Sequence, residues 1–252
     1  MMFDKEIVRC AEKFWRLAGK YEPFPRSLED PILWALPVAI VKLPHLGLKE
    51  IQQWLQERNI ILDFRTPCRA LRACLIAKAG KGIIFLDGCD ARDEQRLSLA
   101  HELAHYLKDY LEPREKVLSC FGEVIKDVLD GDRLPTPEER LKGILNGVNI
   151  GTFTDLLDRA PSSDVHRVDI LNSEDVADQL ALEILAPHQR VISQVNTIGI
   201  RWKDDTVFAS CSRVLTDDFG LPYDIANKYS NMLVMTRRQP RSFRDWIGVR
   251  SA

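Results

Sequence analysis

The spacing of apolar residues in the first part of the chain predicts two helices followed by a short sheet. Residues 3–20 repeat apolar side chains at helical spacing, and residues 47–55 do so again after a proline-rich stretch. Three shorter apolar runs follow, at 60–64, 71–77 and 83–86, and Lys-Ala-Gly-Lys-Gly separates the last two. Short runs joined by glycine-containing turns favour an antiparallel sheet that includes a hairpin.

The remainder of the chain is predicted to form helices around a weakly patterned interval. Residues 97–111 carry an apolar stripe, and residues 173–187 form a second amphipathic run that ends at a proline. Between them, residues 112–172 keep no sustained period and contain several prolines, so we expect an insertion outside the core. Residues 205–235 predict two more helices hinged at 219–222. The fold class is therefore α+β, a small antiparallel sheet on a helical core with a long insertion and a helical C-terminal part.

Composition places the chain among ordinary globular proteins and excludes a global attraction to nucleic acid or membrane. The 252 residues are 45% hydrophobic and 29% charged, with a formal net charge of -2. Charged residues at 4–6 interrupt the apolar run that a secretory signal needs, and the densest apolar stretch, 35–41, is too short to span a bilayer. The six cysteines form no Cys-x-x-Cys pair, which favours reduced thiols. We therefore expect a cytoplasmic protein with no membrane partner.

Two histidines four residues apart, His101 and His105, enclose Glu102 within the predicted helix 97–111. This spacing brings both imidazoles to one side of the helix, at the edge of the apolar stripe. Glu102 points further round, toward any water beside an ion that the imidazoles hold. Two neutral nitrogens with an adjacent carboxylate are typical of a catalytic zinc site. The alternative is a helix with two ordinary histidines, and the placement on an amphipathic helix favours zinc over that alternative.

A site built on this motif needs a catalytic base and a third metal ligand. Zinc held by three protein ligands keeps a position for water, lowers the pKa of that water to about 7 and polarises a carbonyl. Glu102 is the candidate catalytic residue, because it can accept the proton of that water. Glu174 shares a helical face with apolar residues of 173–187, so it is the candidate third ligand. Helical geometry alone leaves open that Glu174 is a solvated carboxylate in a first helical turn.

Two segments together resemble the ImmA/IrrE metallo-endopeptidases, a zincin-like family with an HExxH helix. Residues 96–107, RLSLAHELAHYL, are similar to the family's R-F-T-L-A-H-E-L-G-H helix, and residues 174–187, EDVADQLALEILAP, to its E-x-x-A-N-x-F-A-x-E-L-L-M-P helix. The resemblance implies that Glu174 is the third zinc ligand beside His101 and His105. It also implies an intracellular zinc endopeptidase that cleaves a helix-turn-helix transcriptional repressor, relieving repression in a stress, DNA-damage or phage-defence response.

The resemblance covers roughly residues 45–235 and divides the chain into three parts. These are an N-terminal helical segment (1–44), a metallopeptidase domain (45–235, with 112–172 as an insertion) and a basic C-terminal tail (236–252). The interval between the two motifs is longer than in the family, which implies a lid or a regulatory insert. The departures from the family pattern leave the three ligands in place: Ala104 for glycine, Asp178 for asparagine, Leu180 for phenylalanine and Ala186 for methionine.

The C-terminal tail combines arginines with aromatic residues, a composition that binds phosphates and stacks on unpaired bases. If single-stranded DNA activates the protein, this segment is where we expect it to bind. A solvated or locally packed terminus is the alternative explanation. The candidate nucleic-acid contacts are Arg237, Arg238, Arg241, Arg244 and Trp246.

Two further features concern access to the predicted zinc site. Cys120 lies in the 112–172 interval, and its thiolate is a candidate inhibitory ligand that fills the open zinc position. The run 83–86 is the candidate sheet edge for an extended substrate, with ordinary half-buried sheet as the alternative.

Two other functions stay open on the sequence alone. A zinc hydrolase that acts on a non-peptide amide would use the same site chemistry. A non-catalytic regulatory or sensor protein, with a structural metal or a closed site, belongs to a different class. Replacement of Glu102 distinguishes the enzymes from the binding protein. A hydrolase would lose its activity, whereas a binding protein would keep its function.

Overall fold

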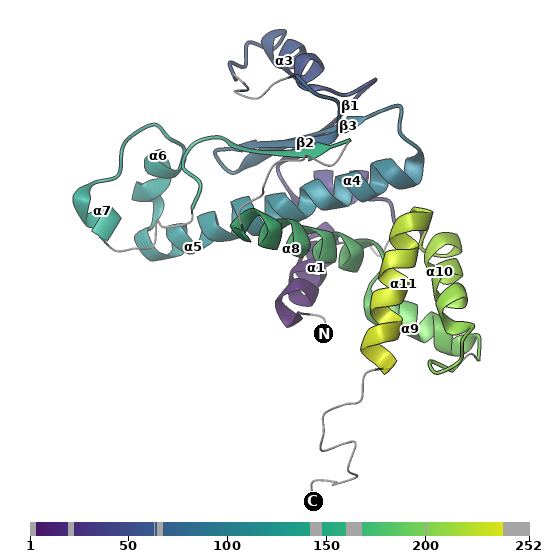
Figure 1. Cartoon of the computed structure of the whole chain (residues 1–252). Coiled ribbons are helices and arrows are strands. Elements are labelled where there is room, and N and C mark those ends of the chain that lie inside the picture. The colour runs from purple at the N-terminus through teal and green to yellow at the C-terminus, as the bar shows by residue number, and fades with distance from the viewer. Residues whose placement is uncertain are drawn as a thin grey trace, which may run out of the picture.

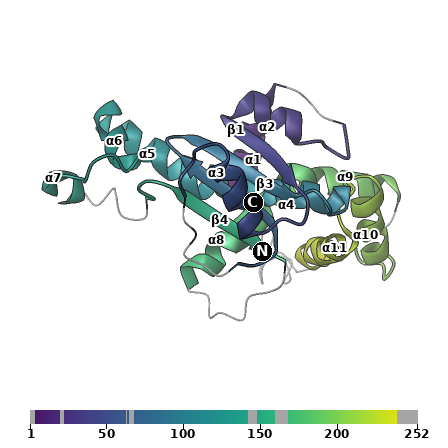
Figure 2. The same cartoon turned by 90° about the horizontal axis from the view of Figure 1, so that it is seen from above.

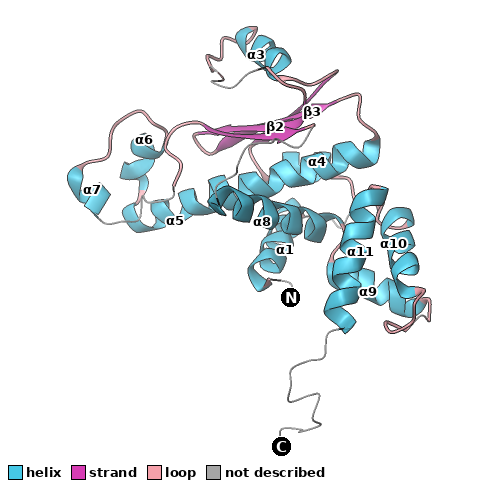
Figure 3. Ribbon diagram, in the orientation of Figure 1, coloured by secondary structure: helices cyan, strands magenta, loops and turns pink. Residues whose placement is uncertain are grey.

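The structure is a computed structural model that describes residues 4–19, 23–62, 64, 68–141, 148–159, 168–199 and 201–238. A sheet lies between the short helix α3 on one face and a helical layer on the other (Figures 1 and 3). The strands are β1 (Val38–Leu43), β2 (Leu71–Lys78), β3 (Lys81–Asp87) and β4 (Phe153–Asp158). The helices are α1 (Lys5–Ala18), α2 (Glu29–Ala35), α3 (Leu48–Gln56), α4 (Arg92–His105), α5 (Glu112–Phe121), α6 (Lys126–Leu129), α7 (Pro137–Leu141), α8 (Val168–Leu185), α9 (His188–Thr197), α10 (Val207–Asp217) and α11 (Tyr223–Arg238).

The described strands form one mixed sheet in the order β1-β3-β2-β4. β2 and β3 form the predicted antiparallel hairpin, and β4 pairs antiparallel with the other side of β2. β1 pairs with β3 in parallel, and α3 and β2 provide the long connection that a parallel pair needs. The α+β class is confirmed, and the sheet is mixed rather than wholly antiparallel.

Three sequence expectations about this sheet need correction. Among the described residues of 60–64 there is no strand, and Ile61 is 99% exposed, so an apolar run alone did not specify sheet there. The run 83–86 lies in β3, which has β1 on one side and β2 on the other, so it is not an edge. The interval 112–172 is not wholly outside the core, because β4 is part of the sheet.

Successive residues of β2 alternate between two apolar cores, as a pleated strand requires. Ala73 and Leu75 belong to the larger core, which includes α4 and α8, whereas Cys74 and Ile76 belong to a smaller core beneath α3. Helices α5–α7 and α9–α11 extend toward opposite ends of the molecule (Figure 2). The sheet and α8 thus enclose α4, the helix with the two histidines.

The helices predicted from periodicity are present. α1 and α3 occur where 3–20 and 47–55 predict them, and α10 and α11 occupy 205–235 with a break at 219–222. α8 begins at residue 168, before the predicted start, so Glu174 does not lie in a first helical turn. Among the described helices, none has the length and apolar character that a membrane span requires.

After His105, α4 continues into a widened π-helical turn (η1, Tyr106–Leu111) and then into α5. Pro113 lies two residues after the end of the turn. In a regular helix its ring would clash with the carbonyl four residues earlier, and the wider turn relieves this conflict. The hydroxyl of Tyr106 donates to the Gly80 carbonyl, and the hydroxyl of Tyr110 accepts from the Gly80 N–H, both at 2.7 Å. The turn therefore fastens the β2–β3 hairpin to the histidine helix.

The substitution Gly82→Ala is expected to destabilise the protein, because the Tyr106 ring packs closely against this residue. A Cβ at Gly82 would lie 3.0 Å from Tyr106 Cε2 and 3.3 Å from Val38 Cγ2, and Tyr106 is fully buried. Overpacking of this kind costs about 1–3 kcal/mol. Urea unfolding should show a lower midpoint for Gly82→Ala than for the exposed neighbour Lys81→Ala, and equal midpoints would contradict the prediction.

Candidate metal centre

The imidazoles of His101 and His105 converge within the protein. Both residues lie on α4, four positions apart, and their Nε2 atoms are 3.0 Å from each other. His101 is 5% exposed and His105 is 1% exposed, so the rings are shielded from bulk water. The predicted one-sided placement of the two histidines is therefore present.

The structure brings Glu174 to these rings from α8, which packs along α4. Its carboxylate spans both histidines, with Oε2 at 3.4 Å from His101 Nε2 and Oε1 at 3.7 Å from His105 Nε2. The side chain is 41% exposed, yet both oxygens face the imidazoles rather than solvent alone. Of the two alternatives that helical geometry left open for Glu174, the inward one is observed.

A fourth group, Asp155 of β4, joins the cluster, and the sequence analysis missed it. Its Oδ2 lies 3.7 Å from His105 Nε2. The four groups, from His101, His105, Asp155 and Glu174, each offer one atom within 4.8 Å of all the others, so they could hold a metal ion. In the sequence, Phe153 and Leu157 on either side of Asp155 are only a weak sign of a strand, because residues 153–158 have no clear apolar face.

Two more carboxylates, also missed, hold the rings through their Nδ1 atoms. Asp178 Oδ1 lies 2.9 Å from His101 Nδ1, and Asp109 Oδ2 lies 2.6 Å from His105 Nδ1. The Ser173 hydroxyl donates to Asp109 Oδ2 at 2.8 Å. An Nδ1–H that donates to a carboxylate leaves the Nε2 lone pair for a metal and makes it more basic. Both rings are therefore oriented as ligands.

The substitution Asp109→Ala is expected to weaken metal binding by about 10- to 100-fold, since outer-shell carboxylates of ligating histidines have effects of this size. Competition with a chromophoric chelator measures the change. Glu115→Ala is the matched control, because Glu115 is an exposed acid on the following helix and pairs with Lys13. Equal affinities for the parent chain and Asp109→Ala would show that the Nδ1 contact does not support a ligand.

The charges around the rings favour a cation. Burial opposes the charged form of His101, but hydrogen bonds to Asp178 and Glu174 raise its pKa to about 9. Burial opposes charge on His105 too, while Asp109 and Glu174 raise its pKa to about 11. The hydrogen bonds to both histidines hold the pKa of Glu174 well below its usual range. The site thus stabilises positive charge at the imidazoles, which a divalent ion would also supply.

Glu102 lies beside the cluster as a fully buried carboxyl group. Burial raises its pKa to about 8, and the charge of Asp155 acts in the same direction. Neither Oε atom has a hydrogen-bond partner among the residues that the structure describes. A buried polar group in this state is unfavourable unless something else satisfies it, and a cation with its water would do so. The orphaned carboxylate is evidence that the residues fit a metal.

The distances also suit a small four-coordinate ion. Zinc binds nitrogen and oxygen at about 2.0–2.2 Å in tetrahedral sites, which requires neighbouring ligand atoms to lie about 3.3–3.6 Å apart. The four contacts measured here, one between the imidazoles and three from imidazole to carboxylate, span 3.0 to 3.7 Å. Small adjustments of the side chains would complete such a site.

The other predicted site residues lie away from this cluster. Cys120 is exposed on α5 and is not part of the metal-binding group, because α5 carries it away from the sheet (Figure 1). Cys120 is thus not a ligand in this conformation, and its inhibitory role stays a prediction. Arg237 is exposed near the end of α11, 5.6 Å from the ring centre of Trp202. Three of the proposed nucleic-acid contacts, and the side chain of a fourth, lie outside the described residues: Arg241, Arg244 and Trp246, and Arg238.

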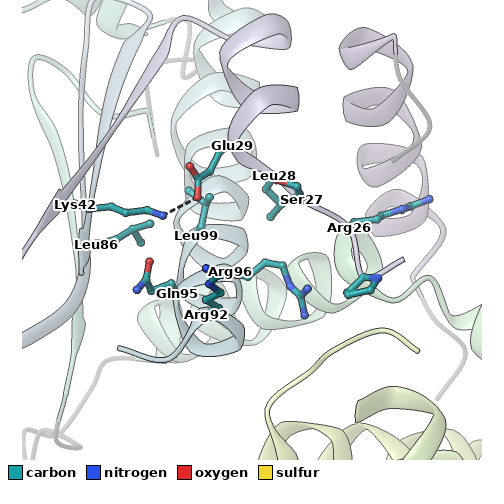
Figure 4. Close-up of a pocket in the computed structure, with 11 residues that line it drawn as sticks. Arg26, Ser27, Leu28, Glu29, Lys42, Leu86, Arg92, Gln95, Arg96 and Leu99 are labelled. Carbon is teal, nitrogen blue, oxygen red and sulfur yellow. Dashed lines mark hydrogen bonds and ion pairs between the residues drawn. The ribbon is translucent and has the colours of Figure 1, made fainter. Parts of the chain in front are cut away.

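A separate cavity of about 460 Å³ lies between α2, β1 and the first half of α4 (Figure 4). Lys42 Nζ pairs with Glu29 there at 2.7 Å, and Arg96 donates to the carbonyls of Phe219 and Gly220. None of the lining residues belongs to the metal-binding group. The cavity is therefore distinct from the candidate metal centre.

Comparison of the chain with protein-family models, with curated proteins and with solved structures gives no match in any of the three. The metal centre consequently rests on the geometry of the chain's own residues. Two imidazoles and two carboxylates, from α4, β4 and α8, form a largely buried group that could hold a metal ion.

Proposed function

We propose that this chain is a zinc-dependent endopeptidase. The observation that carries the proposal is the convergence of two Nε2 atoms and the Glu174 carboxylate beside the buried Glu102. Two imidazoles and one carboxylate form a ligand set that zinc uses in hydrolytic sites. Bound there, zinc supplies Lewis acidity, which makes water more acidic and polarises a substrate carbonyl.

The chain's own residues then have separate roles. Glu102 accepts a proton from the attacking water and returns it to the leaving amine. His101 and His105 provide Nε2 lone pairs and transfer no proton. Asp178 and Asp109 hold these two rings in place through their Nδ1 atoms.

The resemblance of residues 96–107 and 174–187 to the ImmA/IrrE metallo-endopeptidases supports a narrower proposal. The substrate is a helix-turn-helix transcriptional repressor in the cytoplasm, and its cleavage relieves repression during stress, DNA damage or phage defence. Single-stranded DNA is a proposed activator through the tail 236–252. These points come from the resemblance and from the tail's composition.

Incubation of the purified, zinc-loaded chain with a helix-turn-helix repressor from the neighbourhood of its gene tests the proposal directly, and a neighbourhood without one would count against the narrower proposal. We expect a limited number of cleavage products, which mass spectrometry can assign to one or two peptide bonds. A chelator should stop the reaction, and added zinc should restore it. Intact repressor after incubation with the zinc-loaded protein, with single-stranded DNA both present and absent, would contradict the narrower proposal.

One observation favours a second candidate, a non-catalytic sensor with a closed metal site. Glu102 has no exposed surface, and Asp155 can complete a four-ligand set without water. A closed structural site of this kind is saturated by protein ligands. Such a protein would bind zinc and its partner equally well after Glu102→Gln, whereas an endopeptidase would lose cleavage.

A further inference from the structure

β4 occupies the edge of the sheet beside the metal centre. It pairs with β2 alone and runs antiparallel to it, so its other side has no strand among the described residues. Without β4, the edge of β2 would be free next to α4. An extended peptide that adds to a sheet edge makes the same main-chain pairing.

The register of β4 directs one carboxylate into the centre. Asp155 is opposite Leu75, a residue of the core beneath α4, and its Oδ2 reaches to 3.7 Å from His105 Nε2. Phe153 and Leu157 flank it and pack on the same core. The strand therefore presents an apolar-acidic-apolar triplet to the site, much as a bound peptide would present alternate side chains.

Three residues of the centre are shielded from solvent in this conformation, whereas the Glu174 side chain is 41% exposed. Glu102 is fully buried, and the two histidines are almost so. Asp155 adds a fourth possible ligand to the two imidazoles and the Glu174 carboxylate. A peptidase needs an open coordination position, and four protein ligands leave none in a tetrahedral site.

We infer that β4 is an inhibitory strand built into the chain, which occupies the substrate edge of β2 and places Asp155 in the fourth coordination position of the metal. This inference rests on the proposed function. A polypeptide substrate would then pair with β2 only after β4 has left it. The site is latent until that exchange occurs.

Ion pairs at one end of β4 hold the strand against the rest of the sheet, and we call these pairs the latch. Arg69 pairs with Asp158 at 2.7 Å. Arg159, directly after the strand, pairs with Asp87 at 2.6 Å and with Asp90 at 2.8 Å. Arg159 and its partners lie outside the metal-binding group, so the latch can be weakened without changing a ligand.

The test uses the full chain loaded with Co²⁺, whose visible absorption reports the ligands, and acetohydroxamate as the probe of an open position. We expect no spectral change when acetohydroxamate is added to the parent. The Asp155→Asn variant should change its spectrum on addition and bind metal at least about 10-fold more weakly, since even outer-shell partners have effects of 10- to 100-fold. Thr154→Ala is the matched control, because Thr154 is an exposed neighbour on the same strand.

The Arg159→Ala variant tests the effect of β4 detachment separately from the loss of the Asp155 ligand. This variant keeps Asp155, so we expect metal affinity within about 3-fold of the parent, but acetohydroxamate should reach the ion because β4 detaches more often. A parent spectrum that responds to acetohydroxamate as strongly as that of Asp155→Asn would overturn the inference. Unchanged affinity and an unchanged spectrum in Asp155→Asn would overturn it as well.

These outcomes are distinguishable from failure of the proposed function. Suppose that the Asp155→Asn variant binds acetohydroxamate at its metal but cleaves no repressor. This result would support the inference that β4 closes the site, and it would contradict the peptidase proposal. Cleavage by the parent, combined with no effect of Asp155→Asn on metal or probe, would support the peptidase and reject the inhibitory strand.

Discussion

Replacement of Glu102 by glutamine is expected to lower the rate of peptide-bond cleavage by about 10²- to 10⁴-fold, the usual contribution of a general base. Glutamine keeps the shape of the side chain but cannot accept the proton of the attacking water. Because Glu102 is not one of the four groups that could hold the metal, the zinc content should stay at the parent level. Cleavage rates at saturating substrate, together with metal analysis of the same preparation, measure both quantities.

Stability provides a second readout for the same variant. Glu102 is buried, and within the described part of the chain neither carboxylate oxygen has a hydrogen-bond partner, so the neutral amide should leave the free energy of unfolding unchanged or slightly higher. Glu94→Gln, in the first turn of the same helix, is the control for a charge change outside the site. Cleavage by Glu102→Gln at the parent rate would reject Glu102 as the base.

The parts of the site that could be predicted from sequence are those encoded by local spacing. The four-residue separation of His101 and His105 fixes their relative placement as soon as the segment is helical. The β2–β3 hairpin is similarly local, because its strands are joined by a two-residue turn at Ala79 and Gly80. Local geometry of this kind needs no knowledge of the rest of the fold.

The parts of the fold and of the site that the sequence did not predict depend on pairing between segments far apart in the chain. β1 begins within the apolar stretch 35–41, whose length excluded a membrane span but did not indicate a parallel partner at β3. Asp155 reaches the imidazoles only because β4 pairs with β2, roughly eighty residues earlier. A strand with acidic residues at both 155 and 158 has no clear apolar face in the sequence. Its role becomes visible only when the sheet places it beside α4.

Metal affinity is expected to rise steeply with pH, by about tenfold per pH unit between pH 7 and 9. The metal needs the lone pairs at Nε2, and these two atoms lie 3.0 Å apart, a distance at which a proton can bridge them in competition with a metal. Contacts with Asp178, Asp109 and Glu174 raise the pKa of both histidines, so that proton is still bound above pH 7. Each proton released on binding changes the apparent affinity tenfold per pH unit.

The direction of the pH dependence of metal affinity, and the pH range over which it extends, distinguish this site from one built on ordinary histidines. A raised pKa means that protons compete with the metal up to a higher pH, whereas imidazoles with a pKa near 6.5 would stop competing above about pH 7.5. Chelator competition at pH 7, 8 and 9 gives the slope, and calorimetry in buffers of different ionisation enthalpy counts the protons released. Asp109→Ala should flatten the slope, because it removes a carboxylate that raises the pKa of His105. A parent chain whose affinity is flat above pH 7.5 would show that the carboxylates do not hold a proton on the imidazoles, and the electrostatic account of this centre would then be wrong.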